Sequence, residues 1–152
     1  MPIIQLTTHV PASPETCFDL VLNVDVQVQL DSTTRVVGGV TSGPLHLGDC
    51  VTWRAVHFGL PWRMTSKIVE VERPRYFVDA MQHGPFASWR HVHRFEPLPT
   101  GTLIHDSVTY VAPLGILGTL FDAVVLHRYL TGLLASRNQR LRQLTESRTP
   151  SP

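Results

Sequence analysis

The 152-residue sequence has few cysteines and no excess of either charge. Its two cysteines, Cys17 and Cys50, form neither a disulfide framework nor a paired metal-binding motif. We therefore expect reduced thiols and a cytoplasmic protein. Basic and acidic residues nearly balance, at 13 and 12, which leaves a formal net charge of +1. This balance predicts no nucleic acid partner, because proteins that bind nucleic acids usually carry a strongly basic domain.

Long hydrophobic runs are also missing. The longest apolar segment, 111–126, is interrupted by Pro113 and Asp122. The first ten residues lack the basic start and apolar core of a signal peptide. The sequence therefore predicts neither a signal peptide nor a transmembrane segment. It also has no phosphate-binding glycine loop and no nucleophile elbow, so we predict no cofactor, and no motif identifies a reaction.

What the sequence does contain is a series of strand-like segments. A first strand over 3–10 precedes a helix that begins at Ser13 and Pro14, a hydroxyl cap followed by proline at the first helical position. A second short helix, capped by Asn23, is expected over 24–30, although its valines alternate as in a strand. Six further strands, joined mainly by short turns, are expected over 35–40, 50–58, 62–71, 75–82, 86–96 and 102–111.

A long amphipathic helix ends the chain. Leucines, Phe121 and Val124 recur at helical spacings over 116–145, giving an apolar face wide enough to pack on a sheet. Strands followed by a helix on one face indicate the α+β class, here with about seven antiparallel strands. We expect a single domain over 1–146 and a disordered tail over 147–152.

The segment 89–95 carries the most specific information. Strict alternation places Trp89, His91, His93 and Phe95 on one face of a strand and both arginines on the other. Neighbouring strands repeat the pattern with acids, at Asp79 and at Asp106. Half-buried strands that each deliver one or two polar groups into apolar surroundings are typical of a ligand cavity.

A larger set of residues, together with the expected order of strands and helices, carries a resemblance to a known family: Gly48, Asp49, Val51, Trp53, His57, Phe58, Gly59, Phe77, Asp79, Gly84, Pro85, Phe86, Trp89, His91, His93, Phe95, Gly101, Thr102, Asp106, Tyr110, Pro113, Leu114 and Gly115. The sequence resembles the START-like superfamily, also called SRPBCC, which includes polyketide cyclases and lipid-transfer domains. The similarity extends from Ile3 to about Glu146. Within the superfamily it is most similar to a bacterial subgroup without an assigned reaction, some members of which carry the label of cell-division inhibitor.

The resemblance implies a helix-grip fold, in which a curved antiparallel sheet wraps around the C-terminal helix and encloses a cavity. Strand alternation then assigns inward-facing residues to the cavity, an assignment that one register slip would invert. Arg90 and Arg94 must in that case point outward. The predicted ligand-binding residues are Trp53, His57, Trp62, Met64, Asp79, Trp89, His91, His93, Asp106 and Tyr110.

Three interpretations of the histidine and aspartate group remain open. The group forms a buried polar network that fixes the sheet. Alternatively it contacts a ligand, with a histidine as general base and Tyr110 donating to an enolate, as in a cyclase or dehydrase. Thirdly, His91 and His93 bind a metal together with Asp106 or His57, since histidines two residues apart share one face of a strand.

The leading hypothesis is a protein that binds a hydrophobic small molecule or lipid in an internal cavity. The alternatives are a cyclase or dehydrase-like enzyme and a partner-binding module without a ligand; a homodimer is left open. The apolar hairpin over 57–62, with its turn expected at 59–61, either folds over the core or contacts a membrane or gates the cavity.

Overall fold

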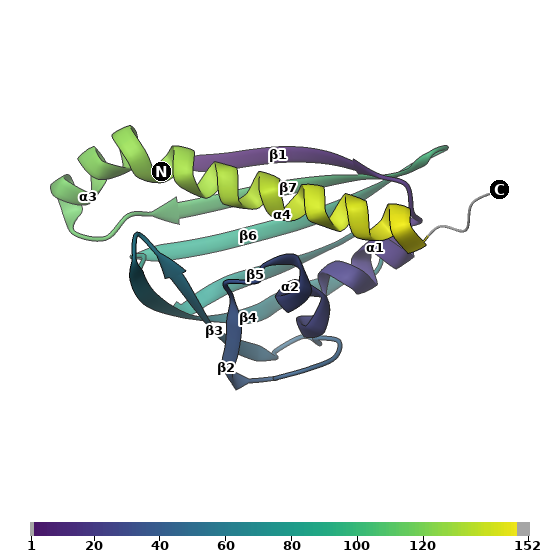
Figure 1. The fold of residues 1–152 in the computed structure, drawn as a ribbon, viewed down its shortest axis with the longest axis horizontal. Coiled ribbons are helices and arrows are strands. Elements are labelled where there is room, and N and C mark those ends of the chain that lie inside the picture. The colour runs from purple at the N-terminus through teal and green to yellow at the C-terminus, as the bar shows by residue number, and fades with distance from the viewer. Residues whose placement is uncertain (1, 149–152) are drawn as a thin grey trace.

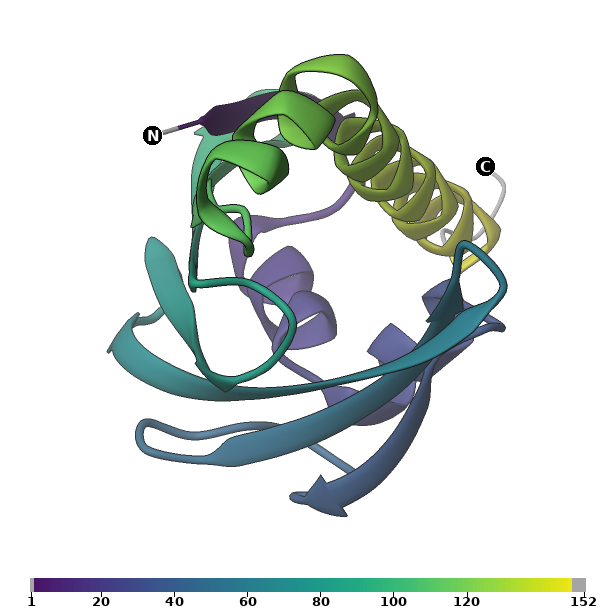
Figure 2. The same cartoon turned by 90° about the vertical axis from the view of Figure 1, so that its left-hand side faces the viewer.

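The computed structural model describes residues 2–148. Within them seven antiparallel strands form one curved sheet in the order β1-β7-β6-β5-β4-β3-β2, and the C-terminal helix lies across its concave side (Figures 1 and 2). This architecture confirms the predicted helix-grip fold. The strands are β1 (Ile3–Val10), β2 (Arg35–Gly39), β3 (Cys50–His57), β4 (Leu60–Glu72), β5 (Tyr76–His83), β6 (Ser88–Leu98) and β7 (Gly101–Val111).

Two short helices follow β1, as predicted. The Ser13 hydroxyl accepts the backbone N–H of Thr16 at the start of α1 (Pro14–Val21). The Asn23 side chain accepts two backbone N–H groups at the start of α2 (Val24–Leu30). These caps satisfy donors that the first helical turn leaves unpaired. The Asn23 cap therefore favours a helix over 24–30, although the valines there alternate as in a strand.

The C-terminal helical run differs from the single regular helix that was expected. It consists of α3 (Gly115–Phe121), the π-helical turn η1 (Asp122–Leu126) and α4 (His127–Arg148). In a π turn a backbone hydrogen bond joins residues five apart. Here the His127 backbone N–H donates to the Asp122 carbonyl. Ser147 and Arg148, predicted as tail, belong to α4, while the rest of the predicted tail lies outside the described residues.

By length and composition the run Gly115–Arg148 could cross a membrane, and only 22% of its most apolar window is buried inside the protein. Its later part, however, packs on the sheet as a core helix. Leu126, Leu130 and Leu134 are buried in one cluster with Ile4 of β1 and Val108 of β7. We therefore describe α4 as the helix that the sheet grips.

The hairpin between β3 and β4 turns one residue earlier than expected. His57 pairs with Leu60, so the turn consists of Phe58 and Gly59 alone. Both have positive φ values, 54° and 73°, as in the turns whose twist matches that of paired strands. A non-glycine residue such as Phe58 rarely adopts a positive φ, so the sequence does not indicate that it belongs to the turn.

Side-chain alternation in β6 follows the prediction. His91, His93 and Phe95 are buried, whereas Arg90 and Arg94 are exposed on the convex face. There Arg90 donates to Glu70 of β4 at 2.9 Å. The register of the sheet is therefore the one that places the imidazoles inside.

Candidate functional site

A cavity of about 740 Å³ lies between the concave face of the sheet and the C-terminal helical run. Its walls are mainly aliphatic and aromatic, and α2, β3 to β6, α3 and α4 all contribute to them. Eight of the ten residues predicted to bind a ligand line this cavity: Trp53, His57, Trp62, Met64, Asp79, Trp89, His91 and His93.

The other two predicted residues, Asp106 and Tyr110, lie behind the cavity wall. Both are on β7, and each is at most 3% exposed. Asp106 accepts a hydrogen bond from Asn138 of α4 at 2.6 Å. The Tyr110 hydroxyl donates to the Asp122 carboxylate and lies 3.1 Å from His127 Nδ1. Alternation correctly placed both residues on the concave face, but it could not show that the helical run covers β7 there.

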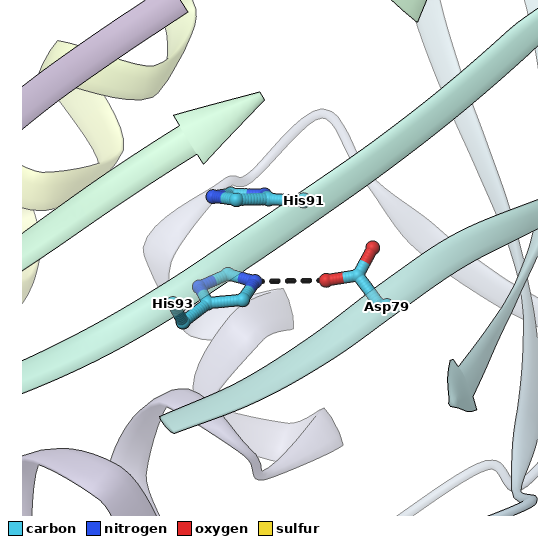
Figure 3. A group of neighbouring side chains, drawn as sticks. All are labelled: Asp79, His91 and His93. Atoms are coloured by element: carbon cyan, nitrogen blue, oxygen red, sulfur yellow. Dashed lines mark hydrogen bonds and ion pairs between the residues drawn. The ribbon is translucent and has the colours of Figure 1, made fainter. Parts of the chain in front are cut away.

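The buried histidines and aspartates come together across three adjacent strands. Asp79 of β5 is opposite His91 of β6, and His93 of β6 is opposite Asp106 of β7. Hydrogen bonds then run diagonally: His91 Nε2 is 2.7 Å from Asp106 Oδ1, and His93 Nε2 is 2.8 Å from Asp79 Oδ2. Figure 3 shows Asp79 with the two imidazole rings, which stack with centroids 3.6 Å apart.

The two histidines have opposite pKa shifts. Burial, followed by the nearby charge of His93, lowers the pKa of His91 to about 4, although Asp106 opposes this. Burial also acts to lower the pKa of His93, but its contacts with Asp106 and Asp79 outweigh burial and raise it. At neutral pH His91 is therefore a neutral imidazole that donates its Nε2 hydrogen to Asp106, whereas the raised pKa of His93 favours its imidazolium form between two carboxylates.

Both carboxylates are ionised at neutral pH. Burial alone would raise their pKa values, but hydrogen bonds and charges from the histidines lower the pKa of Asp79 and hold that of Asp106 well below its usual range. His93 Nδ1 lies 3.3 Å from Asp106 Oδ1 without forming a hydrogen bond of good geometry. This ionic network supports the interpretation that the group fixes the sheet, because a buried charge is tolerated only when it is paired.

The metal interpretation finds weaker support. Asp79, His91 and His93 offer ligand atoms within 4.8 Å of one another. A shared ion, however, needs nitrogen lone pairs that converge. The two rings are stacked with an interplanar angle of 26°, so the lone pairs of their nitrogens lie in nearly parallel planes and do not converge on one point. In addition, His93 Nε2 already pairs with Asp79. His57, one candidate for a further ligand, instead lies 2.8 Å from the Tyr129 hydroxyl.

Residues on the helical run complete the site, and strand alternation could not find them. Arg137 of α4 lines the cavity, and its charge contributes to the lowered pKa of Asp79. Tyr129 lines the cavity and contacts the hairpin at His57 and Phe58. Asn138 holds Asp106 from behind. Arg137 falls in a basic stretch that resembles an ordinary helix end, so only three-dimensional packing distinguishes it.

Solved structures with the same fold extend over nearly the whole chain. They include TTHA0849 from Thermus thermophilus, with 20% identity and a TM-score of 0.72 over 91% of this chain and 96% of that one. A START superfamily protein from Mycobacterium smegmatis matches with 17% identity and a TM-score of 0.73 over 97% and 99%. Norcoclaurine synthase from Thalictrum flavum, solved with dopamine and hydroxybenzaldehyde, matches with 16% identity and a TM-score of 0.70 over 99% and 89%.

At such low identities these structures show a shared fold and nothing about the ligand. No curated protein matches the sequence significantly, and none of these matches carries the cell-division label, which stays a prediction. The profile of one protein family, described as polyketide cyclase/dehydrase and lipid transport, matches residues 1–146. The chain therefore belongs to the polyketide cyclase/dehydrase and lipid transport family.

Proposed function

We propose that the protein binds a hydrophobic small molecule or lipid in the cavity, and that Asp79 accepts a hydrogen bond from the ligand's polar end. The observation that carries this proposal is a roomy apolar cavity with one ionised carboxylate at its wall. Ligand sites commonly combine mostly apolar walls with a few polar groups that fix orientation.

Asp79 is the member of the ionic network best placed for this contact. Its side chain is 18% exposed, compared with 3 to 4% for those of Asp106, His91 and His93. Its Oδ2 pairs with His93, and within residues 2–148 its Oδ1 makes no hydrogen bond. An ionised carboxylate only accepts hydrogen bonds. The chemistry therefore favours a ligand that ends in a hydroxyl or an amine.

A cyclase or dehydrase-like enzyme is less well supported by the same geometry. A general base works best when its pKa is near the operating pH, whereas the pKa of His91 is about 4. The pKa of His93 is raised, but both of its ring nitrogens already face carboxylates, Asp79 and Asp106. Burial, followed by the hydrogen bond to Asp122 and then the charge of that carboxylate, raises the pKa of Tyr110, whose hydroxyl already donates to Asp122 away from the cavity. The structural likeness to norcoclaurine synthase shows only that this fold also serves an enzyme.

Occupancy of the cavity is tested by native mass spectrometry of the purified protein and by titration with naphthol, a fluorescent hydrophobic alcohol. Ala55 lines the cavity, so Ala55→Trp fills part of it and should weaken naphthol binding at least tenfold. The matched control is Ala135→Trp, because Ala135 is exposed on α4 outside this cavity. Equal binding by both variants would contradict the proposal.

The role of Asp79 is tested by comparing naphthol with methoxynaphthalene, which has the same rings but no hydroxyl donor. The wild-type protein should prefer naphthol. In Asp79→Asn we expect His93 to keep the amide oxygen, so that the amide nitrogen, a donor, faces the ligand. The preference should then disappear or reverse while binding of the apolar rings persists. An unchanged preference would show that another group receives the polar end.

A further inference from the structure

The end of the molecule that carries α3 exposes an unusual amount of apolar surface (Figure 1). Ile116, Leu117 and Val124 are 82, 72 and 74% exposed, and Phe58 at the hairpin tip is 52% exposed. We call this surface the apolar crown; it comprises the exposed apolar side chains of residues 58–62 and 114–125. A helix that is apolar on most of its faces normally lies inside a protein, and an exposed apolar patch of this kind marks an interaction site.

The apolar crown surrounds the mouth of the cavity. Phe58, Trp62, Leu117 and Phe121 are exposed and also line the cavity. The rings of Phe58 and Phe121 are 5.9 Å apart, so the hairpin tip and α3 meet there. Figure 2, which views the molecule from this end, shows α3 and α4 over the curved sheet.

A ligand inside the cavity would leave the outer side of the crown uncovered. Ile116, Leu120 and Val124 recur every four residues and are 82, 61 and 74% exposed, yet none of them lines the cavity. This outer stripe therefore needs an occupant that approaches from outside the molecule.

The charged side chains on the elements that carry the apolar crown are mainly cationic, and a carboxylate from another element, that of Asp31 after α2, lines the cavity and its charge reaches His57. Arg63 follows the hairpin tip, and Arg54 is its cross-strand partner on β3. Arg128 lies in the first turn of α4, next to Tyr129. None of these arginines pairs with a carboxylate within residues 2–148. The sequence has no acidic residue over 50–69 and only Asp122 over 112–136, and Asp122 is buried against Tyr110.

The apolar surface and the unpaired arginines together indicate which kind of partner covers the apolar crown. A second copy of the chain, docked crown to crown, would bring the unpaired arginines of both copies together. An anionic lipid surface supplies both a hydrocarbon layer for the apolar side chains and negative headgroups for the arginines.

We propose that the apolar crown docks on an anionic phospholipid bilayer, with α3 lying in the interface and the cavity mouth facing the membrane. The side chains of the outer stripe enter the acyl boundary, and Arg63 and Arg128 remain at headgroup level, as long cationic side chains do. The proposal concerns the surface of the protein and does not require a ligand in the cavity, so loss of naphthol binding would leave it intact.

The proposal is tested by flotation of the full chain with vesicles of phosphatidylglycerol and phosphatidylcholine, and with vesicles of phosphatidylcholine alone. The wild-type protein should float with the anionic vesicles, and added salt should reduce this binding. The triple variant Ile116→Ser, Leu120→Ser, Val124→Ser should bind at least tenfold more weakly. Arg63→Gln and Arg128→Gln should each weaken binding to anionic vesicles about fivefold, the effect of about 1 kcal/mol per cation at a lipid surface.

The matched control is the triple variant Ile3→Ser, Val37→Ser, Leu47→Ser, which removes exposed apolar side chains outside the crown and should bind vesicles as the wild type does. Circular dichroism confirms that each variant is folded. Three results would overturn the proposal: no flotation of the wild type, equal losses in the crown and control variants, or a concentration-dependent dimer that only the crown variant abolishes.

Discussion

The two ends of the cavity use similar aromatic contacts in opposite ways. At the closed end, Phe18 of α1 meets Phe77 and Phe95 edge to face at 5.5 and 5.4 Å, and all three rings are at most 4% exposed. At the mouth, Phe58 and Phe121 meet edge to face at 5.9 Å, and they are 52 and 45% exposed. Ring geometry is alike, but only the first group is removed from water, and removal from water is the larger contribution to stability.

The largest predicted difference in stability is between the same substitution, phenylalanine to alanine, at the two ends of the cavity. Phe18→Ala should lower the free energy of unfolding by about 4 kcal/mol, because it removes a buried ring and leaves a cavity. Phe121→Ala should lower it by less than about 1 kcal/mol, because that ring is half exposed. Urea titrations followed by circular dichroism measure both values. Similar losses would mean that the mouth is part of the folding core.

Within the ionic network, the same contrast separates Asp106 from Asp79. Asp106→Ala should cost about 3 kcal/mol, because it removes the acceptor of the buried His91 and Asn138 hydrogen bonds and one counter-charge of His93. Asp79→Ala should cost less, about 1 to 2 kcal/mol, because Asp79 borders the cavity and water can replace its contact with His93. If Asp79→Ala lowers the stability more than Asp106→Ala does, the contacts of Asp106 with the helix are not the main support of the network.

The sequence predicted the part of this arrangement that depends on local periodicity. Alternation over 89–95 correctly oriented His91 and His93, and cap residues correctly started α1 and α2. The sequence could not predict the contrast between the closed end and the mouth. Leu117 and Leu130 belong to the same apolar pattern, but they are 72 and 9% exposed. A leucine of the helical run is buried only where the sheet lies beneath it. The position at which the sheet ends cannot be read from the local sequence pattern.

The position of the cover over β7 was equally inaccessible to sequence reasoning. Asp106 and Tyr110 alternate as cavity residues would, yet Asn138 and Asp122 of the helical run meet them. The π turn brings Asp122 and His127 to the same side of the helix, where the Tyr110 hydroxyl contacts both. A regular helix, which the sequence predicted, would have separated them.

The pH dependence of stability tests the charge assignment in the buried part of the molecule. The pKa of His91 is lowered from 6.5 to about 4, so between these pH values the unfolded chain binds more protons than the folded one. Stability should therefore fall as pH falls through this window, by at most about 1.4 kcal/mol per pH unit from this residue. The lowered pKa values of Asp79 and Asp106 extend the loss to more acidic pH.

His91→Gln removes this titration while keeping a donor for Asp106, and should flatten the slope between pH 6.5 and 4. His93 has the opposite sign. Its pKa is raised, so its stabilisation is present below its ordinary pKa of 6.5 and is lost as pH rises through the raised value. His46→Gln, on the surface, serves as the control. A slope unaffected by His91→Gln would show that His91 does not change its proton count on folding.

The smallest predicted effect concerns the contact that closes the sheet over the mouth. The Tyr129 hydroxyl lies 2.8 Å from His57 Nδ1, and Phe58 packs on the same ring with centroids 4.5 Å apart. Tyr129→Phe deletes the hydrogen bond but keeps the ring, so the global free energy of unfolding should change by only about 0.5 to 1 kcal/mol. Hydrogen exchange at the hairpin amides should nevertheless accelerate several-fold, because the hairpin tip has few other buried contacts.

Tyr76→Phe removes a hydroxyl from the convex face of the sheet and should leave that exchange unchanged. If Tyr129→Phe also leaves it unchanged, the hairpin is held by the Phe58 ring alone, and the His57 contact has no part in closing the mouth. If the exchange accelerates while the core amides of β6 and β7 stay protected, the mouth opens independently of the closed end. A ligand could then enter through a local motion that leaves the buried network intact.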